Sequence, residues 1–440
     1  MHGKESFKFS FIGAGSCSFT TALVGDILQE DFIKGGELRL VDINPIALQL
    51  AYEAVVKMIE SSNKHFKVTK HTDYRETLEG LDFILFTFVT GSFSSWKTDI
   101  DICTKHGVLQ SVGDTIGPGG IIRAIRNVPV IYNIAKDMEE ICPDAWAINY
   151  SNPEGAMALA LEKYTKIKTF SLCHGTPDTV KKLADKVFHV DYSHMSYRAA
   201  GINHLTWITD LRIDGKDVYP ILKNELVKSG FSKSEPISLE LFNIFGLYPA
   251  PGDRHVEEFF PFYLKEDVLK EKNYEWKNND IITVQRWRDE SIDKFNKLRL
   301  GEMSYLEYGN SGETAMNFVK ALSSDNTTIE MANVMNRGYI DNISDGIIVE
   351  IPNFVDQFGL HPQKIGNLPE AIAAKCEILG REYSLAVKAA IECDKTIAMQ
   401  AMMLDPLVAH CNYPEKLLDE LLAAYKDMLP VEWADQIKSN

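Results

Sequence analysis

The chain has little that marks a membrane protein or a disulfide-bonded secreted protein. No apolar run reaches the about 18 residues that a membrane helix needs, and the longest candidate, residues 83–89, has the length of a buried strand. The N-terminal sequence MHGKESFKFSFIGAG lacks a signal-peptide pattern. The seven cysteines are odd in number and scattered, which argues against a disulfide framework. We therefore expect a cytoplasmic protein without a membrane segment.

Basic residues are also in short supply. The 46 Lys and Arg residues against 62 Asp and Glu residues give a net charge of −16. Sequence-independent nucleic-acid binding needs a basic face, so this balance argues against a nucleic-acid partner. It does not exclude an anionic small substrate, because one local arginine can bind it. The 440 residues, 45% apolar and 25% charged and without internal repeats, suit two or three globular domains.

The first half of the chain alternates short apolar strands with helices. We expect strands at 7–12, 37–43, 81–89, 145–150 and 168–173, and helices at 18–33, 45–62, 121–140 and 153–164. A further helix is expected to begin with Thr176 as its N-cap and Pro177 at its first position. Apolar strands that alternate with helices predict an α/β fold with a Rossmann-like, doubly wound parallel sheet.

The pattern changes near residue 195. Longer strands follow, with Asp214-Gly215 as a hairpin turn, and the chain ends in long helical segments from about 368 to 427. We expect a Rossmann-like domain at 1–195 and an α+β domain at 196–440 that is interleaved with the first.

A glycine-rich turn follows the first predicted strand. Gly13, Gly15 and Ser16 belong to a G-x-G-x-x-S motif, in which Ser18 replaces the third glycine of a dinucleotide fingerprint. Such glycines let the backbone approach a pyrophosphate at a helix N-terminus. Asp42 ends the second strand 29 residues after Gly13, where a carboxylate can bind the ribose hydroxyls and disfavours a 2′-phosphate. These features predict NAD rather than NADP; the alternative is a glycine turn that binds no cofactor.

Two further loops follow predicted parallel strands, at the sheet edge where ligands bind in such folds. Thr90 and Gly91 form the next loop expected at the cofactor, and Asn149 is expected there as well. Asn152 follows in the same NYSNP segment, where amides are better placed to bind hydroxyls than to pack in a core.

Three segments carry groups suited to chemistry. Asp114 lies in a loop of four glycines, GDTIGPGG, and Cys173-His174-Gly175 follows a predicted strand. His204 ends the segment GINH. A thiolate and an imidazole suit a divalent metal ion and leave positions open for substrate oxygens. From spacing alone, however, Cys173 is more often a core residue and His204 more often a structural one.

Taken together, these segments resemble glycoside hydrolase family 4, the NAD- and manganese-dependent glycosidases. The ordered set is GAGS, VDI, GDTIGPGG followed by arginine, NYSNP, LCHG, AGINH and PGDRH, and it spans essentially the whole chain. The same two-domain architecture occurs in lactate and malate dehydrogenases. The resemblance implies a homodimer or homotetramer, with the substrate, metal and subunit contacts in residues 196–440.

The resemblance also implies roles for individual residues. It implies that Cys173 and His204 bind Mn²⁺ or another divalent metal. The position of the base falls on Asp253, and Asp114 and His174 are candidates for the acid that protonates the leaving group. The resemblance implies substrate contacts from Asn152, His174 and Asp114, and further candidate substrate contacts are Asn203, Arg254 and His255.

The resemblance bears on the substrate as well. Members that act on 6-phosphoglycosides carry Asp or Asn after the metal-binding cysteine, whereas this chain has His174. That difference implies unphosphorylated α-glycosides. Arg254 could bind a uronate carboxylate bidentately, although it could instead pair with Glu257 or Glu258, and Asp114 would repel a nearby carboxylate. We favour an α-galacturonide or α-glucuronide, with an α-galactoside or α-glucoside as the alternative.

The chemistry implied by the resemblance is redox-assisted elimination, an exception to the usual two-carboxylate hydrolysis. NAD⁺ oxidises C3, a base removes the C2 proton, the aglycone leaves C1, and the hydride returns after water adds. The competing hypotheses are a 2-hydroxy acid dehydrogenase, which would use an Asp–His pair without a thiolate, and a non-catalytic NAD sensor. Sensitivity to a chelator separates the glycosidase from both.

Overall fold

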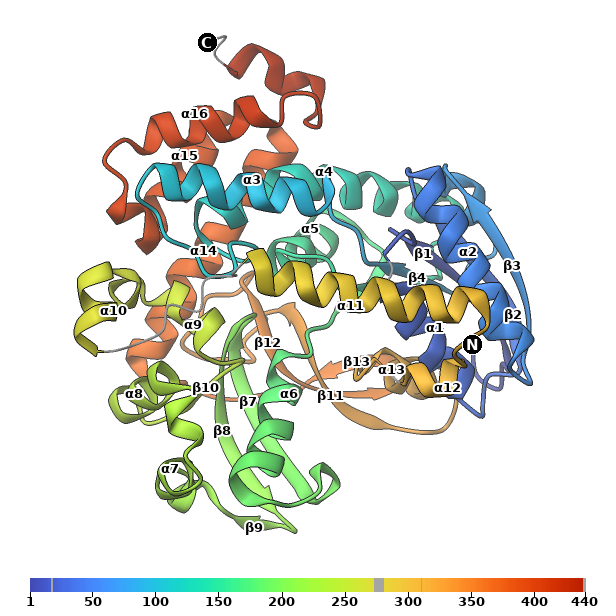
Figure 1. Cartoon of the computed structure of the whole chain (residues 1–440), viewed down its shortest axis with the longest axis horizontal. Helices are drawn as coiled ribbons and strands as arrows, with labels where there is room; N and C mark the ends of the chain where they lie inside the picture. The colour runs from blue at the N-terminus through green and yellow to red at the C-terminus, as the bar shows by residue number, and fades with distance from the viewer. Residues whose placement is uncertain (17–18, 273–280, 310, 438–440) are drawn as a thin grey trace.

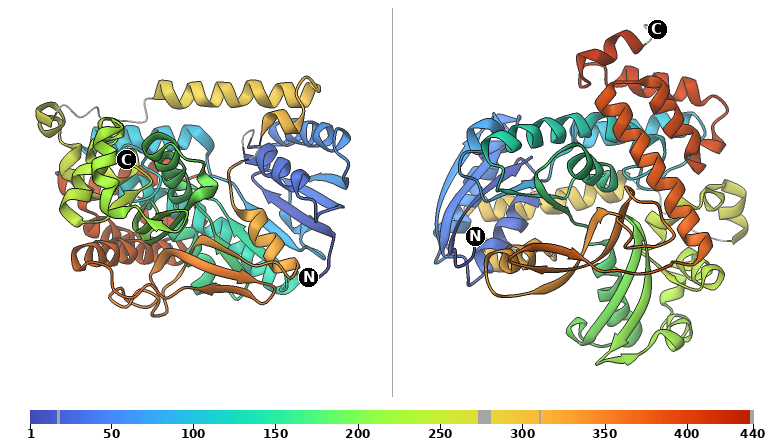
Figure 2. Two further views of the ribbon diagram at one scale, coloured as in Figure 1. Left: turned by 90° about the horizontal axis from the view of Figure 1, so that it is seen from below. Right: turned by 180° about the vertical axis from the view of Figure 1, so that it is seen from behind.

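The computed structural model describes residues 1–16, 19–272, 281–309 and 311–437. Their strands form one mixed sheet of thirteen strands, with helices packed around it (Figures 1 and 2). Ser18, the third position of the glycine-rich motif, lies outside the described residues.

The N-terminal half of the sheet is parallel. Its strands are β1 (Ser6–Ile12), β2 (Gly35–Val41), β3 (His65–His71), β4 (Phe83–Phe86), β5 (Trp146–Asn149) and β6 (Lys168–Ser171). They lie in the order β3-β2-β1-β4-β5-β6, which is the doubly wound dinucleotide-binding topology. The predicted Rossmann-like sheet is thereby confirmed. The prediction omitted β3, whose sequence HFKVTKH alternates polar and apolar residues at the sheet edge instead of forming an apolar run.

The helices of this half connect successive strands. They are α1 (Phe19–Gln29), α2 (Pro45–Glu60), α3 (Ser92–Lys105), α4 (Gly117–Ile141), α5 (Glu154–Tyr164) and α6 (Gly175–Lys182). The predicted cap of α6 was wrong: the helix begins at Gly175, with His174 at the N-cap position. Thr176 lies inside the first turn, where its hydroxyl donates to Glu350 Oε1 over 2.7 Å. The hydroxyl of Thr176 thus bonds to Glu350 of a distant strand instead of capping α6.

The C-terminal half extends the same sheet with antiparallel strands. They are β7 (Met195–Ile202), β8 (Leu205–Ile213), β9 (Lys216–Asp217), β10 (Tyr248–Ala250), β11 (Thr328–Met335), β12 (Ile348–Asp356) and β13 (Gly359–Pro362). Asn333 of β11 pairs with Ser171 of β6, and Glu350 of β12 pairs with Gly201 of β7. The expected interleaving therefore takes the form of a shared sheet. The predicted turn at Asp214-Gly215 lies between β8 and β9, with positive φ at both residues.

The C-terminal half contributes further helices, some of which pack against those of the first half. They are α7 (Tyr219–Lys228), α8 (Pro236–Phe245), α9 (Asp253–Phe259), α10 (Glu266–Lys272), α11 (Ile281–Leu300), α12 (Tyr305–Tyr308), α13 (Ala315–Ser323), α14 (Glu370–Glu392), α15 (Lys395–Leu404) and α16 (Pro414–Ala424). Helices α14 to α16 confirm the predicted helical end of the chain and lie beside α3, α4 and α5 (Figure 1). Apolar residues of both halves thus share one core.

Short helical turns complete the chain. They are η1 (Tyr74–Thr77), η2 (Leu183–Phe188), η3 (Tyr192–His194), η4 (Phe231–Lys233), η5 (Pro261–Leu264), η6 (Pro406–His410) and η7 (Val431–Gln436).

A buried ion pair between Asp99 and Arg126 joins α3 to α4. Arg126 donates to both carboxylate oxygens of Asp99, over 2.9 and 2.6 Å, and both side chains are fully buried. The guanidinium lies 3.9 Å from the ring centroid of Tyr425, whose hydroxyl also donates to Asp99. Arg126 therefore holds the C-terminal region onto the Rossmann helices.

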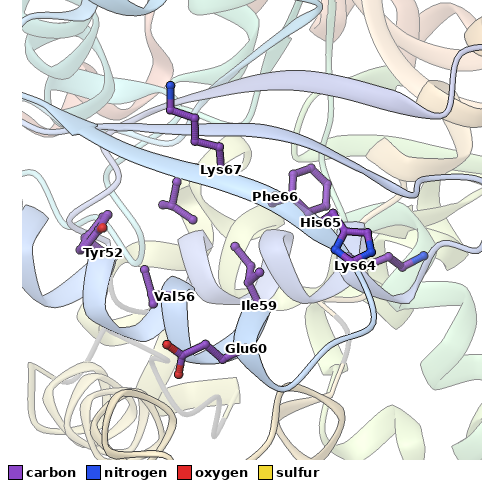
Figure 3. Close-up of a pocket in the computed structure, with 9 residues that line it drawn as sticks. Tyr52, Val56, Ile59, Glu60, Lys64, His65, Phe66 and Lys67 are labelled. Atoms are coloured by element: carbon purple, nitrogen blue, oxygen red, sulfur yellow. The ribbon is translucent and has the colours of Figure 1, made fainter.

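An open groove lies between α2 and the edge strand β3 (Figure 3). It is lined by the C-terminal end of α2 and the first residues of β3, including Ile59, Glu60 and Phe66. The predicted site residues follow the opposite, carboxyl ends of the strands, so this groove is separate from them. In the described part of the chain, no helix is long and apolar enough to cross a membrane.

Candidate active site

The glycine-rich turn packs tightly against two neighbouring loops. Gly13 has a φ of +89°, and a Cβ atom there would lie 2.7 Å from the Cα atom of Phe88. A Cβ on Gly15 would lie 2.7 Å from Asp42 Oδ2. Ser16 follows, and its Oγ accepts from the backbone N–H of Phe19 at the start of α1 over 3.4 Å. Side chains at Gly13 and Gly15 would therefore collide with Phe88 and Asp42, and their absence leaves the backbone of the turn accessible.

Asp42 holds this turn from the end of β2. Its carboxylate accepts the backbone N–H of Gly15 and of Asn44, each over 2.8 Å. The side chain of Asn44 in turn caps α2. Next to Asp42, the side chain of Ile43 is 91% exposed. The carboxylate of Asp42 and the exposed side chain of Ile43 therefore lie next to each other in the sequence just after β2.

The loops after β4 and β5 are joined by a hydrogen bond from the backbone N–H of Phe88 to Ser151 Oγ over 3.1 Å. The backbone N–H of Thr90 donates to Asn127 Oδ1 over 2.9 Å, and Gly91, with a φ of +89°, precedes α3. Asn149 is fully buried, and its side chain bonds to both backbone groups of Ser151. The side chain of Asn149 therefore shapes the NYSNP loop, and its contact with a cofactor stays a prediction.

A chain of three side chains connects Asp114 to His204. Thr115 Oγ1 lies 2.8 Å from Asp114 Oδ1 and 2.6 Å from His204 Nδ1. A threonine hydroxyl has one proton, and a carboxylate only accepts. If that proton goes to Asp114, the hydroxyl must accept from the N–H at His204 Nδ1. The arrangement leaves the lone pair of His204 free at Nε2.

The surroundings of His204 favour this neutral tautomer. Burial lowers the pKa of His204 to about 4, so the ring is uncharged at neutral pH. Its backbone has a φ of +62°, an uncommon conformation for a residue other than glycine, in the short turn between β7 and β8. Asp114 is held from its other side by Asn152, whose Nδ2 donates to Asp114 Oδ2 over 3.1 Å.

Cys173 lies between β6 and α6 in a region of negative charge. Its Sγ accepts from the backbone N–H of Gly175 over 3.4 Å. Burial raises the pKa of the thiol well above its usual range, and the carboxylates of Glu350 and Glu154 act in the same direction. A bound cation would reverse both effects. Among the described residues, no three His, Cys, Asp or Glu side chains form a metal site on their own.

The segment PGDRH lies beside these residues. The ring of His255 stands edge-on to that of His204, with centroids 4.4 Å apart and planes at 70°. Burial lowers the pKa of Arg254, and the charge of Asp114 opposes this shift most strongly. The charge of His174 lowers the pKa of both His204 and His255. The structure thus brings five predicted residues into one region, namely Asp114, His174, His204, Arg254 and His255.

Asp253 has a different surrounding. It is 2% exposed, and its two oxygens accept the backbone N–H of Ile237 over 2.9 Å and of Ser238 over 2.6 Å. Burial, followed by the charge of Glu235, raises the pKa of Asp253 to about 6. Asp253 therefore caps the start of α8. Its assignment as general base stays a prediction, and this geometry does not support it.

Asn203 belongs to a buried polar cluster where the two halves of the sheet meet. Its Nδ2 donates to Glu154 Oε2 over 2.6 Å and lies 3.4 Å from Glu350 Oε2. Asn333 donates to the other oxygen of Glu154 over 2.5 Å. Asn203 is 1% exposed, and its Nδ2 is occupied, whereas its Oδ1 is buried without a hydrogen-bond partner among the described residues. Its predicted contact with substrate stays a prediction. Its observed role is to support the turn that carries His204.

His174 is paired with a residue that the sequence did not reveal. Its Nδ1 lies 3.1 Å from Glu313 Oε1, and this hydrogen bond raises the pKa of His174. Sequence reasoning also missed Thr115, Glu154 and Glu350. A single carboxylate in the apolar strand IIVEIPNFV was the available signal for Glu350.

Comparison with known proteins defines the class of this site. The model of the family 4 glycosyl hydrolases matches residues 8–189, and that of the family's C-terminal domain matches residues 199–408. The chain belongs to the family 4 glycosyl hydrolases, which confirms the expected resemblance and makes the protein a glycosidase.

Curated relatives cover nearly the whole chain. The α-galactosidase of Bacillus subtilis is 30% identical and covers 96% of this chain and 99% of its own. The α-galacturonidase of Thermoanaerobacter italicus is also 30% identical, with 97% of this chain and 98% of its own covered.

Solved structures support the fold. A 6-phospho-α-glucosidase from gut microorganisms, in complex with NAD and Mn²⁺, is 19% identical and covers 97% of this chain and 99% of its own, with a TM-score of 0.82. The malate dehydrogenase of Cryptosporidium parvum is 13% identical and covers 88% of this chain and 99% of its own, with a TM-score of 0.51. This likeness confirms the expected dehydrogenase-like architecture, while family membership favours a glycosidase over the 2-hydroxy acid dehydrogenase.

Proposed function

We propose that this protein hydrolyses unphosphorylated α-glycosides and uses NAD and a divalent metal ion to do so. The observation that carries the proposal is the Asp114–Thr115–His204 chain, which would leave His204 Nε2 available as a ligand. The α-galactosidase and α-galacturonidase activities named for two relatives support an α-glycoside as substrate. The homodimer or homotetramer implied by the resemblance stays a prediction.

The glycine-rich turn supports NAD as the cofactor. The residues that would hold it are Gly13, Gly15 and Asp42, with the exposed side chain of Ile43 available to cover the adenine. Asp42 already holds the backbone of the turn, and its carboxylate leaves no favourable place for a 2′-phosphate.

Removing the carboxylate of Asp42 is expected to weaken NAD⁺ binding at least about tenfold. A hydrogen bond to a charged group contributes about 1.5–3 kcal/mol, and 1.4 kcal/mol corresponds to tenfold in affinity. Calorimetric titration of Asp42→Ala with NAD⁺ measures the effect. Asp73→Ala is the matched control, because Asp73 also accepts a backbone N–H at a helix start. Equal affinity of both variants would contradict the proposed cofactor site.

Cys173 and His204 fit a divalent metal ion. One donor is the thiol of Cys173, and the other is the His204 imidazole, which burial keeps neutral. If the hydroxyl of Thr115 donates to Asp114, the proton of this imidazole lies on Nδ1 and Nε2 can bind the ion. Because these are two protein ligands, substrate oxygens would complete the coordination.

Loss of the Thr115 hydroxyl is expected to weaken Mn²⁺ binding about 10- to 100-fold, since outer partners of metal-binding histidines have effects of this size. Thr115→Val keeps the shape of the side chain but removes the oxygen that accepts from His204 Nδ1. Thr115→Ser keeps that oxygen and should bind Mn²⁺ like the unmodified protein. Competition with a fluorescent chelator measures both affinities, and identical affinities for the two variants would refute this role.

The cofactor, the metal ion and the protein's own residues would have separate roles. NAD and the metal ion would supply reversible oxidation at C3 and stabilisation of charge on the neighbouring oxygens. Asp114 and Asn152, which bond to each other, would bind sugar hydroxyls. His174 is held by Glu313 with a raised pKa, so its protonated form can supply a proton to the leaving oxygen.

The charges near Arg254 support a uronide. Burial raises the pKa of Glu258 to about 8, so this carboxyl is largely uncharged at neutral pH. Arg123 and Arg254 both interact with the charge of Asp114. A substrate carboxylate could join Asp114 as a partner of these two guanidinium groups. An α-galactoside is the second candidate, supported by the α-galactosidase relative.

A panel of p-nitrophenyl α-glycosides tests the proposed function. The panel includes the α-galacturonide, α-glucuronide, α-galactoside and α-glucoside, each with and without NAD⁺, Mn²⁺ and a thiol reductant. Release of p-nitrophenol that requires all three additions is expected, with the highest rate on a uronide. Release without NAD⁺ or metal ion would overturn the proposed chemistry, and a preference for the galactoside would overturn the role of Arg254.

A further inference from the structure

Residues 311–314 precede α13 and contact α1 and the N-cap residue of α6. Asp26 of α1 accepts from the backbone N–H of Ser311 over 2.9 Å and also from its hydroxyl. The hydroxyl of Ser311 accepts the backbone N–H of Glu313 over 2.9 Å. The segment is therefore fixed onto the helix that follows the glycine-rich turn.

Glu313 extends from this segment to His174. Its Oε1 lies 3.1 Å from His174 Nδ1, and its side chain is 6% exposed whereas that of His174 is 53% exposed. A carboxylate only accepts hydrogen bonds, so the proton must lie on Nδ1. The contact fixes the position of Nδ1, and thereby the orientation of the ring. Nε2 does not take part in this contact.

No other residue holds His174 in this way among those that the structure describes. Asp178 is 40% exposed, lies 4.0 Å from His174 Nε2 and is also paired with Lys181. Helix α6 fixes only the backbone of His174, which stands at its N-cap position without a capping side-chain bond. Ring orientation therefore depends on Glu313.

We propose that Glu313 is a positioning residue for the reaction, which holds the His174 ring beside Cys173. The inference rests on the proposed function, because it assumes that His174 faces the substrate. It adds that the segment anchored to α1 through Asp26 supplies this support. The half of the chain after residue 195 thus contributes to the Rossmann side of the site by a contact that spans 139 residues.

A double-mutant cycle tests whether Glu313 acts through His174. Glu313→Ala is expected to lower kcat on the best p-nitrophenyl glycoside about 10- to 100-fold, the range seen for outer-shell partners, with KM changed less than about threefold. Glu313→Gln should recover most of the loss, because its amide oxygen can still accept from Nδ1. In the His174→Ala background, Glu313→Ala should have no further effect. Equal losses in both backgrounds would overturn the proposal.

A second readout does not depend on turnover. In protein labelled with ¹⁵N-histidine and free of NAD and metal, the His174 ring should show a protonated Nδ1, identified by its loss in His174→Ala. Glu313→Ala should abolish that signature, and the control Asp178→Asn should retain it. An unchanged signature in Glu313→Ala would overturn the proposal. If the signature behaves as expected but the unmodified protein hydrolyses no glycoside, the proposed function fails and the hydrogen-bonding role stands.

Discussion

Replacing Cys173 with serine is expected to lower metal-dependent glycoside hydrolysis at least about a hundredfold. A hydroxyl remains protonated where a thiolate would bind the ion, and removing a direct ligand should exceed the 10- to 100-fold effect of an outer partner. A titration of the hydrolysis rate with Mn²⁺ measures the loss, and much higher Mn²⁺ should restore part of it.

Cys411→Ser provides the matched control. Cys411 is a partly buried free cysteine that follows η6, outside the candidate site. This variant should keep the rate and Mn²⁺ dependence of the unmodified protein. If Cys173→Ser retained full metal-dependent turnover, Cys173 would be a packing residue and the metal assignment would fail.

Replacing Asp114 with asparagine is expected to lower kcat about 10³-fold. The amide can donate to Thr115 Oγ1, which would turn the threonine proton toward His204 Nδ1 and move the histidine proton to Nε2. The lone pair needed for the metal would then be lost. Losses of about 10³- to 10⁴-fold follow when an amide replaces the carboxylate that fixes a histidine tautomer in hydrolases. Steady-state kinetics at saturating NAD⁺ and Mn²⁺ measure the effect.

Asp101→Asn separates this effect from a general loss of charge. Asp101 is an exposed carboxylate of α3 that pairs with Lys97. Its replacement should leave kcat unchanged. A loss below tenfold in Asp114→Asn would show that the proton on His204 is not controlled through Thr115.

Local patterns in the sequence were sufficient to predict most of the fold. Strands β1, β4 and β5 are short apolar segments between helices, and such segments have few alternatives to a buried parallel sheet. Strand β3 could not be found in this way, because an edge strand needs no continuous apolar run. The cap of α6 failed for another reason: Thr176 bonds to Glu350, which lies 174 residues away in the sequence.

The same distinction applies to the site. Asp42, Asn152 and Cys173 could be proposed because each lies at or just after the carboxyl end of a predicted strand, and these ends share one edge of the sheet. Partners that come from distant elements cannot be recognised from the sequence around the residue that they support. Glu313, which lies 139 residues from His174, is an example. Asp253 illustrates the converse: a family motif drew attention to it, and the helix start that it caps comes from a segment 15 residues earlier.

The most direct test of the account is to run the hydrolysis in D₂O and to analyse the released sugar by NMR and mass spectrometry. If the reaction passes through removal of the C2 proton, the product should carry deuterium at C2 after a single turnover in the presence of NAD⁺ and Mn²⁺. Product sugar that retains hydrogen at C2 would contradict the account and would indicate hydrolysis by a conventional pair of carboxylates.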